Sequence, residues 1–149
     1  MRFDEAIAGL RGAGQNGHIA RGLLARAAFR RAIGAWDGAA RDLDEAHEFA
    51  EPGPMRLFLS DIALERARLA LARREGYAPL NGLVEPSLPL SASPDAAAAA
   101  SLREEARKQL DMARRLIAEC GYHRRDEELA ELEEVIAGAR RFAGLPPRV

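Results

Sequence analysis

The stretch that decides the fold is GAWDGAARDLDEA, residues 34–46. Within it an aromatic, a small, a large apolar and a small residue follow at steps of three, four and three, the spacing of one helical face. In this stretch the four positions are Trp36, Ala39, Leu43 and Ala46. The same pattern occurs 33 residues earlier, at Phe3, Ala6, Leu10 and Ala13. A shorter copy without the aromatic residue occurs near the C-terminus, at Ala106, Leu110 and Ala113. Self-similarity at a period of about 20–50 residues predicts stacked helical units that bury their apolar faces against one another.

The composition bounds the class of protein. The 149 residues suffice for one domain of about four to six helices. Basic side chains number 22 and acidic ones 23, a formal net charge of −1, so nucleic acid is not the expected partner. Cys120 is the single cysteine, which excludes an intrachain disulfide and favours a reducing compartment. Because the sequence lacks an apolar run of about 18 residues, we expect a cytoplasmic protein without a membrane partner.

Glycine and proline divide the chain into helices of one all-α domain, 1–149. We expect helices over 3–13, 19–33, 37–50, 55–75, 94–120 and 123–143. The helix over 55–75 is apolar over most of its girth, so it should be the central element. The domain then comprises a half repeat at 1–17, a repeat at 18–52, a repeat at 55–120 and a capping helix at 122–144.

A proline-rich loop over 76–93 interrupts the repeat at 55–120. The residues Ser93-Pro94-Asp95 predict the start of the next helix, with Ser93 as its cap. A loop of this length is uncommon in a compact domain. Four roles stay open for it: a lid over a groove, a docking site, a contact between copies of the chain, and a cover for apolar surface of its own domain.

The pattern over 34–46 resembles the second helix of a tetratricopeptide repeat (TPR), and Pro52 stands where that repeat has a proline after the helix. The preceding helix fits less well, because Arg26 and Arg30 occupy slots where a leucine and a tyrosine are typical. The slots that do match are Leu23 and Ala27. The resemblance implies a right-handed solenoid of antiparallel helix pairs that acts as a protein-interaction module.

Two further runs resemble a narrower group of proteins. They are PMRL at 54–57 with the helix that follows, and GYHRRDEEL at 121–129. Both resemble the C-terminal TPR arrays of bacterial NACHT/STAND-type signalling proteins, which implies a scaffold or sensor in a signalling or defence assembly. No Gly-x-x-x-x-Gly-Lys-Ser/Thr loop for a nucleotide is present. The first helix lacks its mate, so we expect either a missing upstream domain or a homodimer through the uncapped N-terminal end.

The resemblance also implies where a partner binds, because the first helix of each repeat lines the concave face. The register places there Arg21, Leu24, Ala28, Arg31, Arg56, Ser60 and Arg66. Arginine offers a planar fork for carboxylates, so an acidic or C-terminal peptide is the expected type of protein partner. The alternative is that these arginines are solvated or pair with neighbouring acids. The lysine and asparagine clamp of chaperone-binding TPR proteins is absent.

The rival hypothesis is a small metal-dependent helical-bundle enzyme. Its candidate side chains are Asp44, His47, Cys120 and His123. The spacing of Cys120 and His123 is half of a zinc site, but a closed structural site needs four ligands. Asp44 and His47 lack the second copy that a di-iron bundle carries. We therefore expect no catalytic residue, no metal and no cofactor.

Overall fold

The computed structural model describes residues 2–14, 16–51, 56–83, 89–90 and 94–138. Throughout these ranges every regular element is helical, so the all-α class and the six helices are confirmed. The elements are α1 (Arg2–Gly12), α2 (Asn16–Ile33), α3 (Trp36–Ala50), α4 (Arg56–Glu75), α5 (Ala96–Cys120), the short 3₁₀ helix η1 (His123–Arg125) and α6 (Asp126–Ala137). The expected continuation of the last helix to residue 143 lies outside the described residues.

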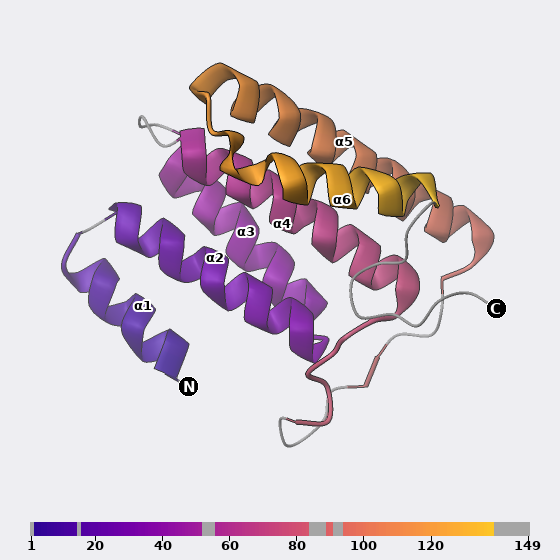
Figure 1. Ribbon diagram of the computed structural model, residues 1–149. Helices are drawn as coiled ribbons and strands as arrows, with labels where there is room; N and C mark the ends of the chain where they lie inside the picture. The colour runs from indigo at the N-terminus through magenta and orange to yellow at the C-terminus, as the bar shows by residue number, and fades with distance from the viewer. Residues whose placement is uncertain (1, 15, 52–55, 84–88, 91–93, 139–149) are drawn as a thin grey trace.

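Consecutive helices run in opposite directions and lie side by side, from α1 at one end to α5 and α6 at the other (Figure 1). The most extensive contacts join α2 to α3 and α4 to α5. α4 is the central element, as its sequence predicts, because it contacts α2, α3, α5 and α6. α1 packs against α2 at the N-terminal end of this arrangement.

Two apolar clusters form the core, and α4 contributes to both. One is built mainly by α2 and α3 and includes Leu23, Trp36, Leu43 and, from α4, Ile62. The other joins α4 to α5 and α6; among its members are Leu64, Leu71, Leu110, Ile117 and Leu132. Because α4 contributes residues to both clusters, it links the two halves of the chain.

The repeated stripe is buried differently in different helices. Its α3 and α5 copies are fully inside: Trp36, Ala39, Leu43, Ala46, Ala106, Leu110 and Ala113 are all buried. In α1, Phe3 and Leu10 are half-buried and Ala6 is exposed, while Ile7 is the buried residue of that helix. Ala13, in the turn after α1, is exposed as well. Ile7 packs against α2 at Gly22: a Cβ added at Gly22 would lie 3.3 Å from Cγ1 of Ile7.

Arg26 and Arg30, the residues that depart from the TPR pattern, both bind a carboxylate on the next helix. Asp42 of α3 is buried. It accepts hydrogen bonds from Arg26 Nε at 3.1 Å and Nη2 at 2.7 Å, and from Arg30 Nη1 at 2.9 Å. The hydrogen bond with Asp42 raises the pKa of Arg26, despite partial burial. A buried ion pair thus takes the place of apolar contacts between α2 and α3.

The described parts of the loop pack against the turn between α2 and α3. Leu80 donates its backbone N–H to Ala32 O at 2.8 Å. Gly34 has a φ of 90°, and a Cβ there would lie 2.5 Å from Leu90 Cδ2, so only glycine fits this turn. At the C-terminal end of the loop, α5 begins after Asp95, whose carboxylate accepts a hydrogen bond from Ala98 N at 2.7 Å. Asp95 is therefore the cap, and Ser93 lies outside the described residues.

Candidate functional site

A groove with a volume of about 630 Å³ lies between α2 and the turn that joins α5 to α6, with α4 as its floor. Its lining residues are Arg21, Leu24, Ala25, Ala28, Leu57, Phe58, Asp61, Glu65, Arg68, Tyr122 and Arg125. Figure 1 shows α2, α4 and the turn between α5 and α6, the elements that carry these residues. Three helices separated in sequence thus contribute to one surface, which we call the α2–α4 groove.

Helical periodicity explains why these side chains share one surface. On α2 the lining residues Arg21, Leu24 and Ala28 are three and four positions apart. On α4, Leu57 and Asp61 are four apart, and Glu65 and Arg68 continue the same row. Residues at such spacings lie on one face of a helix. The groove is therefore a direct consequence of two helical rows that face each other.

One end of the groove is apolar and accessible. The Leu57 side chain is 45% exposed, and among the described residues it is the exposed large hydrophobic that lies on a helix rather than in the loop. Next to it the guanidinium of Arg21 lies over the Phe58 ring, 5.7 Å from the centroid. Such a stacked cation leaves its N–H groups available to a ligand. This end can accept an apolar side chain beside a negative charge.

The other end of the groove is a network of alternating charges that begins at Glu65. Arg31 of α2 and Arg68 of α4 both bind this buried carboxylate, the second at 3.3 Å. Arg68 also binds Glu128 of α6. Arg125 closes the network with bonds of 2.6 Å to Glu128 Oε1 and 2.9 Å to Asp61 Oδ1. Three arginines and three carboxylates leave this end formally neutral.

The network shifts the ionisation of its members. Burial alone would lower the pKa of Arg125, but its hydrogen bond with Glu128 and the charge of Asp61 outweigh burial and raise it. Burial would raise the pKa of Glu128, yet the hydrogen bonds from Arg125 and Arg68 lower it below its ordinary value. Arg125 and Glu128 are therefore both charged at neutral pH, and their ion pair is a fixed part of the groove wall.

The residues expected on the concave face fall into four places. Arg21, Leu24 and Ala28 line the α2–α4 groove, and Arg31 borders it through Glu65. Arg56 is exposed and pairs with Glu119 of α5. Ser60 is buried and donates its hydroxyl to Leu57 O at 2.7 Å. Arg66 faces a different groove, where it pairs with Asp44 at 3.0 Å. Arg31, Arg56 and Arg66 therefore pair with neighbouring acids, as the alternative in the sequence analysis expects.

Sequence reasoning missed the α4 side of the groove by one position. It followed a row through Arg56 and Ser60, whereas the groove is lined by the adjacent row through Leu57 and Asp61. The signal that distinguishes the rows is Ser60, a small side chain that bonds its own helix and packs inward. Tyr122 and Arg125 were missed because nothing local in the sequence shows that the α5–α6 turn comes back to α2.

The side chains of the rival metal hypothesis have other partners. Asp44 pairs with Arg66, and His47 lies 3.6 Å from Glu51. Cys120 is exposed, and its Sγ donates to Leu116 O; His123 Nδ1 lies 2.9 Å from Asp126. Within the described ranges no three His, Cys, Asp or Glu side chains gather in a group that could hold a metal ion.

Comparisons with protein-family models, with curated proteins and with solved structures each find no match for this chain. The described helices also include none that is both long enough and apolar enough to cross a membrane. The class that the structure defines is therefore an all-helical domain with a groove across three of its helices.

Proposed function

We propose that the protein is a protein-interaction module with a TPR-like, right-handed solenoid fold, and that it binds a peptide or protein partner in the α2–α4 groove. The order of contacts supports the solenoid. α2, α4 and α6 contact one another in turn along one side, and each is paired with α3 or α5 behind it. In a solenoid each unit contacts only its neighbours in this way.

The observation that carries the binding site is Leu57. Leu57 lies on a helix, stays 45% exposed and lines a concave surface, so it offers apolar surface to a partner. It lies beside Phe58 and Tyr122, side chains of the kind enriched where partners dock. The partner we propose carries an apolar side chain for this end of the groove.

The charge of the partner follows from Arg21. In the described structure Arg21 makes a ring contact with Phe58 and no ion pair, whereas Arg31, Arg68 and Arg125 are committed to carboxylates. A single carboxylate next to the apolar anchor fits Arg21. The preference for acidic partners is therefore local to one arginine and does not extend along the groove.

The setting we propose is a bacterial signalling or defence assembly, and the support is the sequence resemblance over 54–57 and 121–129. The second of these runs contains Tyr122 and Arg125, which line the groove. The resemblance thus concerns residues of the proposed binding surface and not only residues of the core.

A pull-down from lysate of the source organism tests the proposal. Wild-type protein, Leu57→Asp and Leu83→Asp serve as baits and are compared by quantitative mass spectrometry. Leu83 is the matched control, because it is an exposed leucine in the loop, 77% accessible and outside the groove. We expect a protein that wild type and Leu83→Asp enrich and Leu57→Asp loses. Equal enrichment by all three baits would exclude the groove as the binding surface.

A further inference from the structure

Glu65 lies at the charged end of the α2–α4 groove, and the neutrality of that end depends on its carboxylate. The side chain is 6% exposed, although it lines the groove. It accepts hydrogen bonds from Arg31 Nε of α2 and, at 3.3 Å, from Arg68 Nη1 of its own helix. A carboxylate held between two arginines cancels positive charge that a ligand in the groove would otherwise meet.

The two arginines depend on Glu65 to different degrees. Arg68 has a second carboxylate, that of Glu128 on α6. Arg31, whose side chain is 18% exposed, has Glu65 as its only carboxylate partner among the described residues. Loss of the Glu65 charge would therefore leave Arg31 as an unpaired cation at the edge of the groove, while Arg68 would keep its bond to α6.

The length of α2 separates Arg31 from Arg21, the arginine that the proposed function assigns to the carboxylate of the partner. The two residues are ten positions apart on α2, which is about 15 Å along the helix axis. About five residues of an extended peptide cover this distance. A ligand with one carboxylate at Arg21 can thus bring a second one to the charged end, where it meets the negative charge of Glu65.

We propose that Glu65 is a specificity-determining residue of the α2–α4 groove, which admits ligands with one carboxylate at Arg21 and discriminates against a second acidic residue at the far end. The inference rests on the proposed function, because it concerns the partner of the same groove. Its physical basis is selection against the wrong partner: the second carboxylate meets a like charge, and the cations that would bind it are already paired.

The test is an NMR titration of the full ¹⁵N-labelled chain with two amidated hexapeptides. One is acetyl-Asp-Leu-Ser-Ser-Ser-Gln-amide, and the other has Glu in place of the Gln, five positions after the Asp. Wild type should bind the Glu peptide no more tightly than the Gln peptide. Glu65→Gln should bind the Glu peptide about tenfold more tightly than the Gln peptide, because Arg31 is then free to form a charge-assisted hydrogen bond with it.

Two further variants distinguish an effect of charge from an effect of packing. Arg31→Gln leaves the Glu65 carboxylate without its α2 partner, so it should favour the Gln peptide. The double variant Glu65→Gln/Arg31→Gln removes one charge of each sign and should lose the preference for the Glu peptide. A role of Glu65 in packing alone would not be reversed by the second substitution. Arg31→Gln tests the sign of the effect even if Glu65→Gln is unstable.

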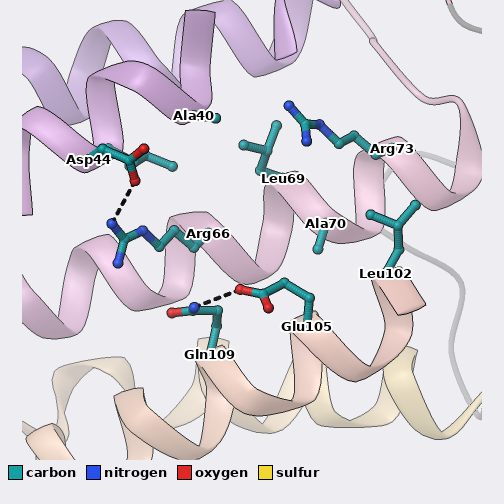
Figure 2. A pocket seen from close by; sticks show the side chains of 10 residues that line it. Ala40, Asp44, Arg66, Leu69, Ala70, Arg73, Leu102, Glu105 and Gln109 are labelled. Carbon is teal, nitrogen blue, oxygen red and sulfur yellow. Dashed lines mark hydrogen bonds and ion pairs between the residues drawn. The ribbon is translucent and has the colours of Figure 1, made fainter. Parts of the chain in front are cut away.

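The matched control is Asp44→Asn, which changes the net charge of the protein by the same amount. Asp44 of α3 pairs with Arg66 of α4 at 3.0 Å (Figure 2). Both residues line a second cavity, of about 330 Å³, which shares no lining residue with the α2–α4 groove. Asp44→Asn should therefore bind the two peptides as wild type does.

Four results would overturn the role of Glu65. They are a preference of wild type for the Glu peptide, no such preference in Glu65→Gln, a preference that persists in the double variant, and the same preference in Asp44→Asn. A failure of the proposed function gives a different result. In that case neither peptide causes saturable shifts around Leu57 in any of the proteins, which would reject the α2–α4 groove as a peptide site.

Discussion

α3 and α1 carry the same stripe of residues and bury it to different extents. In α3 the stripe lies inside the core, with Trp36 and Leu43 packed in one cluster. In α1, Phe3 and Leu10 are half-buried and Ala6 is exposed. α3 packs between α2 and α4, whereas α1 packs against α2. The difference teaches that the pattern specifies which face is apolar, and the number of neighbouring helices decides how much of that face is buried.

The largest expected effect comes from truncating the same slot in the two helices. Leu43→Ala should lower the free energy of unfolding by about 2–5 kcal/mol, because it opens a cavity in the core. Leu10→Ala should cost only about 1 kcal/mol, since that side chain is already partly exposed to water. Urea unfolding followed by circular dichroism measures both. Equal losses would show that α1 is packed as tightly as α3 and break the comparison.

A polar version of the comparison sets the buried Asp42 against the exposed Asp37, both on α3. Asp42→Ala removes the buried carboxylate from Arg26 and Arg30 and leaves them Asp4 of α1, at 2.7 and 3.9 Å, as their acidic partner among the described residues. The loss should cost about 3 kcal/mol. Asp37→Ala removes a surface partner of Arg73 and should change stability by less than about 1 kcal/mol. The same unfolding measurement distinguishes them. A small effect of Asp42→Ala would mean that water replaces this ion pair at little cost.

α5 contains a buried polar group that lacks a partner, and replacing it should stabilise the protein. Gln109→Met keeps the length of the side chain and removes the unsatisfied Oε1. We expect the free energy of unfolding to rise by about 1 kcal/mol. Thermal unfolding measures this change, and a lower melting temperature would indicate that water or another group already satisfies the amide.

The smallest effect is expected at α6, the other terminal helix, and depends on pH. Arg125 and Arg68 hold the pKa of Glu128 below its ordinary value. A lowered folded-state pKa stabilises the fold above the unfolded-state pKa of about 4.3 and is lost as pH falls. The stability advantage of wild type over Glu128→Gln should therefore shrink between about pH 6 and pH 3. Glu127→Gln on the exposed neighbour controls for the lost charge; an advantage that stays constant would argue against the network.

The helices and the central place of α4 could be predicted from the sequence, because apolar periodicity and glycine and proline breaks are local signals. The stripe of α1 could not be placed, since its burial depends on neighbours that the pattern does not specify. The same limit applies to Arg26 and Arg30. In the sequence they are charged residues at positions where a TPR helix has apolar ones, and only the structure shows that both bind Asp42 on α3.

The groove itself was predictable on one side only. Arg21, Leu24 and Ala28 follow from the register of α2, whereas the row on α4 was offset by one residue. A one-residue offset turns a helix by about 100°, which is enough to move a side chain from the groove to the core. Local sequence does not settle that choice when both rows contain polar residues.

Site-specific photocross-linking tests the central claim, that the α2–α4 groove is the partner surface, most directly. p-Benzoylphenylalanine replaces Leu57 in one sample and Leu83 in another, and both are irradiated in lysate of the source organism. We predict a cross-linked protein at position 57 that is absent at position 83 and disappears when Arg21→Ala is added. The same cross-linked proteins at both positions, or none at 57 when the pull-down has captured a partner, would contradict the claim.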